Sequence, residues 1–222
     1  MRLHLTTTPN TEPIPVDYMP KMVGVLHKWL GKNNEEHGKI SMYSFSALHG
    51  AKMTEHEVNC PTGAKFFISL YDTDLAKKII KSVLDSPEMF AGLIVTDLTI
   101  EEDKDLSDRD VFYFASPILV KSSSDKYTEK REYTFEDSKA SEIMTETLKT
   151  KMRMAGLPID DDLEIKFDTS YANKKHTIFW YKGISMRVNK CPVIIKGSAQ
   201  TKSFAWNVGI GNSTGIGLGA IY

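Results

Sequence analysis

Two histidines and a lysine near the start of the sequence have side chains suited to acid–base chemistry. His37 stands in the polar stretch 33–39, where an exposed imidazole titrates near neutral pH and can take up or release a proton. His27 precedes it on a predicted helix, and Lys39 follows it with an ammonium group. The same pattern also fits ordinary surface histidines, so the residues alone leave both interpretations open.

Metal ligation is a weaker interpretation of the remaining candidate ligands. His49, His56 and Cys60 are spaced by seven and four positions, which matches no zinc motif, and a fourth ligand is lacking. We therefore expect no metal and no other cofactor. Cys60 and Cys191 show no paired spacing, which favours reduced thiols and a cytoplasmic location, and no apolar run reaches the ~20 residues of a membrane span.

A glycine-rich segment at residues 209–219 is the most specific pattern in the chain. Its five glycines in eleven positions are Gly209, Gly211, Gly215, Gly217 and Gly219. Glycine permits positive φ and lets another chain approach the backbone amides, as an anion or an RNA backbone requires. The lysine and hydroxyl of a P-loop are missing, and no acidic residue follows as in a dinucleotide fingerprint, so both nucleotide interpretations are disfavoured.

The charge is distributed unevenly, although the net charge is only −1. Residues 85–110 hold nine acidic side chains against two basic ones, whereas residues 163–222 hold eight basic against two acidic. Within the basic region, residues 173–190 resemble a strand pair in which cations alternate with aromatic rings. Such a pair can bind phosphates and stack on bases, or it can be a sheet with inward aromatics and outward lysines. The candidate RNA-binding cations are Lys52, Lys174, Lys175, Lys182, Arg187 and Lys190.

Hydrophobic periodicity predicts the elements that must position these residues. The first half has a strand from Leu3, a helix through Leu30, and then a strand, strand, helix and strand at residues 40–48, 64–71, 74–84 and 93–100. The second half loosely repeats this order at residues 110–121 (a strand broken by Pro117), 137–155 (helix), 163–171, 177–188, 191–197 (strands), 201–208 (helix) and 216–221 (strand). The order predicts an α+β fold of two tandem ferredoxin-like β-α-β-β-α-β domains, residues 1–110 and 111–222.

The glycine-rich segment also carries a family resemblance. Its pattern of Gly-apolar-Gly, five residues and Gly-apolar-Gly resembles the signature loop of the RAMP superfamily, in particular of CRISPR-associated endoribonucleases that cut repeat RNA into guide RNAs. Residues 14–18, residues 43–48 and the Ser-Pro-Ile element at 116–118 are similar to further segments of that family. The resemblance implies a tandem ferredoxin-like fold with the loop near the C-terminus.

The resemblance further implies a metal-independent endoribonuclease that binds CRISPR repeat RNA. His37 would be the general acid or base, His27 its partner, and Lys39 the cation near the scissile phosphate. A 2′-hydroxyl attack would leave a 2′,3′-cyclic phosphate and a 5′-hydroxyl. The first alternative is a non-catalytic RAMP-type RNA-binding subunit of a CRISPR effector complex, and the second is a ferredoxin-like protein without an RNA role. The sequence leaves open whether the protein forms a homodimer.

Overall fold

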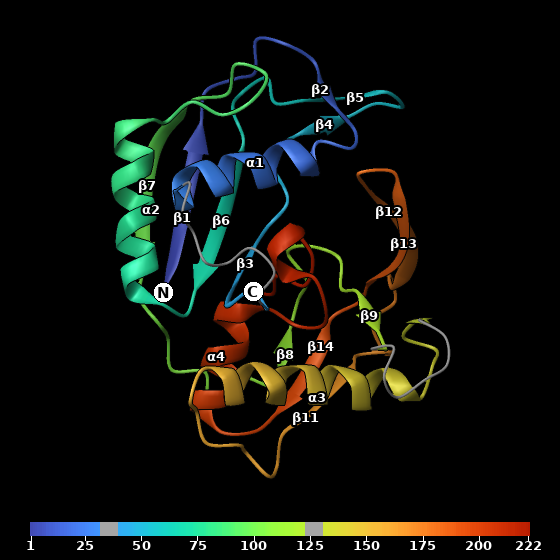
Figure 1. Cartoon of the computed structure of the whole chain (residues 1–222). Coiled ribbons are helices and arrows are strands. Elements are labelled where there is room, and N and C mark those ends of the chain that lie inside the picture. Colours follow the sequence, from blue (N-terminus) through green and yellow to red (C-terminus); the bar gives the residue numbers. More distant parts are fainter. Residues whose placement is uncertain (32–39, 123–130) are drawn as a thin grey trace.

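A computed structural model describes residues 1–31, 40–122 and 131–222 of the protein (Figure 1). The helices in these ranges are α1 (Met19–Leu30), α2 (Thr73–Asp85), α3 (Lys139–Met154) and α4 (Ala199–Val208), with a 3-10 turn η1 (Thr214–Ile216). In the parts of the chain described, no helix is long and apolar enough to cross a membrane.

The first half of the chain forms an antiparallel sheet with the strand order β3-β6-β1-β7. The strands are β1 (Arg2–Thr7), β3 (Tyr43–Phe45), β6 (Lys65–Leu70) and β7 (Val95–Glu101). This order sets the first strand between the third and the fourth, which is the ferredoxin-like arrangement. The helices α1 and α2 contact each other and pack on the sheet (Figure 1).

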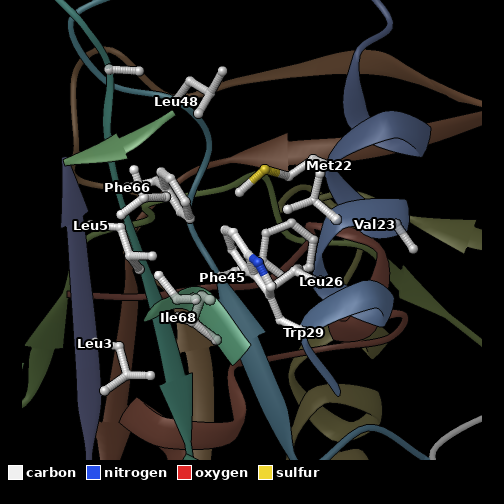
Figure 2. Close-up of a cluster of buried hydrophobic side chains, with 14 of the residues drawn as sticks. Leu3, Leu5, Met22, Val23, Leu26, Trp29, Phe45, Leu48, Phe66 and Ile68 are labelled. Carbon is white, nitrogen blue, oxygen red and sulfur yellow. The ribbon is translucent and has the colours of Figure 1, made fainter. Parts of the chain in front are cut away.

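Apolar residues on the facing sides of the helix and the sheet build the first core. Figure 2 shows Leu5 of β1 and Ile68 of β6 beside Leu26 and Trp29 of α1, all of them at most 1% exposed. Burying a side chain of this size stabilises the fold by about 1.5–3 kcal/mol. The helix α2 is fixed at its start by Asp72, whose carboxylate accepts hydrogen bonds from two backbone N–H groups of its first turn.

The second half repeats this topology around the three-stranded sheet β11-β14-β8. Its strands are β8 (Val111–Phe112), β11 (Glu164–Phe167) and β14 (Val193–Lys196). On the free side of β8, the N–H of Tyr113 donates to the Tyr222 carbonyl at 3.0 Å, and the N–H of Tyr222 donates to the Tyr113 carbonyl at 2.9 Å. The segment that ends at Tyr222 thus takes the place of the fourth strand, and α3 packs on β11 (Figure 1).

Two strand predictions in the second half differ from the structure. Residues 177–188 are not one strand but belong to the hairpin of β12 (Lys175–Tyr181) and β13 (Ile184–Lys190), which turns at Lys182 and Gly183 with positive φ. Residues 216–221 pair only through an isolated bridge between Phe114 and Ile221 because the preceding glycines follow a tight, looped path.

Short strands complete the fold, and all but one of them lie where the hydrophobic pattern predicts no strand. The exception is Val120–Lys121, at the end of the strand predicted at residues 110–121. A small sheet in the first half joins β2 (Ile14–Pro15), β5 (Glu57–Asn59) and β4 (Lys52–Met53). In the second half, β9 (Val120–Lys121) pairs with β10 (Glu132–Tyr133). Pairs of two residues carry too little periodicity to be recognised from the sequence.

Two separate hydrophobic cores follow the two halves of the chain. The larger core consists of residues between 3 and 95, and the second consists of residues between 106 and 221. The exact division into domains at residues 1–110 and 111–222 stays a prediction.

Candidate functional site

The glycine-rich segment, residues 209–219, lies at the junction of the two halves. Its two ends are joined by a hydrogen bond of 2.8 Å from the Ile210 N–H to the Gly219 carbonyl. The segment is also bound to the second half, because the Asn212 N–H donates a hydrogen bond to the Leu119 carbonyl at 2.8 Å. The turn η1 within it contacts both α1 and β3 of the first half.

The five glycines of this segment are buried and have a packing role. A Cβ atom at Gly209 would lie 2.7 Å from the Gly219 carbonyl oxygen and 2.9 Å from the Cβ of Ser44. At Gly215 it would collide with the Ser41 hydroxyl, and at Gly217 with the sulfur of Met19. At these three positions a glycine is needed because the segment packs closely against the first half. Contact of the glycines with RNA stays a prediction.

A basic groove of about 670 Å³ opens beside the half-buried residues of the glycine-rich segment. Ser213 and Ile216 of the segment form one wall. The positively charged side chains that line the groove are Lys121, Arg131 and Arg187, from β9, the start of β10 and β13. Glu132 is the acidic residue of the lining, and its carboxylate accepts a 2.7 Å hydrogen bond from the Arg187 N–H. The groove therefore presents an excess of positive charge to an anionic ligand.

The predicted basic hairpin separates its cations between two sides. Arg187 lines the basic groove, whereas Lys190 lines a second hollow of about 460 Å³ together with Trp180, which is 56% exposed. Lys175 lies opposite Lys190 in the strand register, and burial and the charge of Lys175 lower the pKa of Lys190. Like charges at directly paired positions repel each other, which destabilises this end of the hairpin.

The remaining predicted cations lie at the margins of these hollows. Lys182 occupies the hairpin turn, with its Nζ 5.6 Å from the ring centroid of Tyr181. Lys174 is partly buried before β12, and Lys52 is exposed on β4, next to Met53, which also lines the second hollow. The structure thus places Lys190 at one hollow and Arg187 at the other, whereas Lys52 is not a lining residue of either.

The predicted catalytic residues are only partly within the described chain. His27 lies in the last turn of α1 and is partly exposed, and its carbonyl accepts a 3.1 Å hydrogen bond from the Gly31 N–H. His37 and Lys39 lie outside the described residues. Their proposed partnership with His27 stays a prediction.

A metal site is not indicated by the described residues, among which no group of three or more His, Cys, Asp or Glu side chains could hold an ion. His49 and His56 are exposed, whereas Cys60 is buried and burial raises the pKa of its thiol.

One residue of the junction, Lys151, was not recognised from the sequence. It lies on α3 and is 2% exposed, and its Nζ donates to the Val208 carbonyl at 2.8 Å and to the Thr214 hydroxyl at 3.0 Å. Burial lowers the pKa of this ammonium to about 7. The sequence did contain a signal of this burial, because Lys151 follows Met144 and Leu148 at the spacing of the buried helix face.

Solved structures with the same fold define the class of protein. A structure described as CRISPR associated protein Cas6 covers 100% of this chain and 98% of its own, with 16% identity and a TM-score of 0.80. A Cas6-related protein from Pyrococcus furiosus aligns over 100% and 97%, with 20% identity and a TM-score of 0.81. A RAMP protein described as binding different RNA substrates aligns over 100% and 98%, with 20% identity and a TM-score of 0.83. The fold is therefore the tandem ferredoxin-like fold of the Cas6 and RAMP proteins.

The sequence itself identifies the family within this class. Residues 100–222 match the family model of the C-terminal part of CRISPR associated protein Cas6. The chain belongs to this family. A search among curated proteins gave no match.

Proposed function

We propose that this protein binds CRISPR repeat RNA in the cytoplasm and cleaves it within precursor transcripts to release guide RNAs. The observation that carries the proposal is the match of residues 100–222 to the Cas6 family. The basic groove beside the glycine-rich segment supports it, because RNA-binding proteins position the backbone by pairing cations with phosphates.

In RNA binding, cationic side chains contact phosphates and aromatic side chains contact bases. Lys121, Arg131 and Arg187 pair with phosphates in the basic groove, which makes binding salt-dependent. In the second hollow, the exposed Trp180 offers a stacking surface to an unpaired base.

Cleavage proceeds by an internal transfer reaction. The 2′-oxygen attacks the adjacent phosphorus while a base removes its proton, and the 5′-oxygen departs with a proton from an acid. His37 and His27 share the acid and base roles, and Lys39 stabilises the negative charge that develops on the phosphate. The products are a 2′,3′-cyclic phosphate and a 5′-hydroxyl.

The test is incubation of the purified protein with the host repeat RNA in EDTA. We expect the wild type to cut at one site and His37→Ala to lose at least about 100-fold in rate, which is the usual contribution of a general acid or base. His56→Ala removes an exposed histidine from the β4–β5 turn and serves as the matched control. A single 2′-deoxy nucleotide before the scissile phosphate should abolish cleavage, and its continued cleavage would disprove the mechanism.

A non-catalytic RNA-binding subunit of a CRISPR effector complex is the second candidate. It is supported by the similarity to the RAMP protein described as binding different RNA substrates, a description that names binding and not cleavage. Tight, salt-dependent RNA binding without cleavage by the wild type would select this function.

A further inference from the structure

The buried ammonium of Lys151 sits where α3, the end of α4 and the glycine-rich segment meet. It donates to the carbonyl of Val208, the last residue of α4, and to the hydroxyl of Thr214 in η1. An ammonium group has three N–H donors, so these two bonds leave a third. Within the described part of the chain, no carboxylate pairs with it, and burial alone lowers its pKa.

A buried cation without a counter-charge is costly, because desolvation is not offset by an ion pair. A methionine of similar shape would avoid this cost, and the neighbouring positions of the same helix face, Met144, Leu148 and Met152, are apolar. Without a partner the buried group loses its proton more readily, whereas an anion beside it would supply the missing charge and favour the ammonium form.

A pocket of about 250 Å³ adjoins this ammonium. Its polar lining consists of hydroxyl and amide side chains, namely those of Ser41, Thr147, Asn212, Ser213 and Thr214. The Thr214 oxygen accepts from Lys151, which leaves its own proton for an anion. The described lining contains no acidic residue. The Thr147 hydroxyl donates to the Ile143 carbonyl at 2.7 Å, so the ammonium and the hydroxyls of Ser213 and Thr214 are the donors that match a phosphate group.

The pocket adjoins the basic groove. Ser213 lines both hollows, so a chain of phosphates that follows the groove reaches the pocket at this residue. We propose that the Lys151 pocket binds one phosphate of the RNA backbone. This inference rests on the proposed RNA-binding function, but the pocket chemistry itself can be tested without RNA.

The first experiment uses the wild-type protein and inorganic phosphate. The 13Cε resonance of Lys151, assigned by its loss in Lys151→Met, is followed at pH 7.5 during a phosphate titration against chloride at equal ionic strength. We expect a saturable shift towards the protonated position, since a bound dianion favours the ammonium form. A resonance that responds equally to both salts would overturn the anion site.

The second experiment assigns the phosphate to RNA. Repeat RNA affinity is measured over a range of salt for the wild type, Lys151→Met and Thr214→Val, with Lys149→Met as a control that removes a charge from the same helix. We expect the slope of log K against log salt to fall by about 0.7 for Lys151→Met, the value for one single-strand phosphate contact, and to be unchanged for Lys149→Met. Thr214→Val keeps the charge and should weaken binding with an unchanged slope.

The two experiments together distinguish a wrong assignment of the phosphate to RNA from a wrong proposed function. An unchanged slope in Lys151→Met, with a positive phosphate titration, would overturn the RNA assignment and leave a site for free phosphate. Absence of RNA binding by the wild type would instead refute the proposed function, while the titration would still decide the pocket.

Discussion

Lys151 shows how a single side chain links the folded state to pH. The unfolded chain protonates this amine up to about pH 10.5, whereas the folded protein does so only up to about pH 7. Between these values the unfolded state binds more protons, so the free energy of unfolding rises with pH. The free-energy cost of burying the charge is largest below pH 7, where the amine of the folded protein is mostly protonated.

This linkage predicts a pH-dependent difference between the wild type and Lys151→Met. From pH 7.0 to 8.5, the wild type should gain about 1.5 kcal/mol of unfolding free energy relative to the variant. Urea unfolding at each pH measures the difference, and contributions of the two cysteine thiols cancel because both proteins contain them. Parallel pH profiles would contradict the depressed pKa.

The sequence predicted some of the site at this scale and missed the rest for physical reasons. The spacing of the glycines identified the segment, but their packing against Ser44, Ser41 and Met19 depends on contacts between distant residues. Lys151 was missed because charged residues are normally assigned to solvent, and only its tertiary surroundings show that this one is buried.

At the scale of elements, local patterns predicted the long segments well. The helix predicted at residues 137–155 is α3, Lys139–Met154, and the one predicted at 74–84 is α2, Thr73–Asp85. The strand pair at residues 173–190 was predicted, but the hydrophobic periodicity joined its two strands into one at residues 177–188, because the short turn at Lys182 and Gly183 directly follows an apolar run. The small sheet β2-β5-β4 depends on pairing between segments that lie about forty residues apart.

The β12–β13 hairpin carries a prediction of its own. Replacing Lys174, Lys175 and Arg187 with alanine should weaken repeat RNA binding and flatten the salt slope by about 2, for three lost phosphate contacts on a single strand. Filter binding or fluorescence anisotropy over a salt series measures the slope.

The matched control for the hairpin removes three exposed lysines elsewhere. Lys77 and Lys81 lie on α2 and Lys166 on β11, outside the hairpin and both hollows. Their triple alanine variant should keep the wild-type slope. Equal slopes for the hairpin variant and the wild type would remove this surface from the proposed function.

At the scale of the whole molecule, Arg2 connects the two halves. Its guanidinium lies 3.8 Å from the ring centroid of Phe67 and 3.5 Å from that of Trp206 on α4. It also donates to the Ser69 hydroxyl at 2.6 Å and to the Ile221 carbonyl at 2.7 Å. Its planar group thus holds β1 and β6 against the C-terminal segment, and burial lowers its pKa to about 9.

Arg2→Lys should therefore destabilise the protein although it preserves the charge. A lysine cannot stack between two rings and reach both acceptors, so we expect a loss of about 2–3 kcal/mol in the free energy of unfolding. Arg153→Lys, on the exposed side of α3, should change it by less than about 0.5 kcal/mol. Urea denaturation of the wild type and the two variants measures these free energies of unfolding. A decrease for Arg2→Lys as small as that for Arg153→Lys would contradict the bridging role of Arg2.

The placement of residues 209–219 between the halves also sets an order of events during translation. The contacts of Met19, Ser41 and Ser44 with this segment cannot form until it has left the ribosome. At typical synthesis rates, the first half waits on the order of 10 s after its own completion. During that interval its junction surface is uncovered, so the nascent chain passes through a stage that is more prone to aggregation than the finished protein.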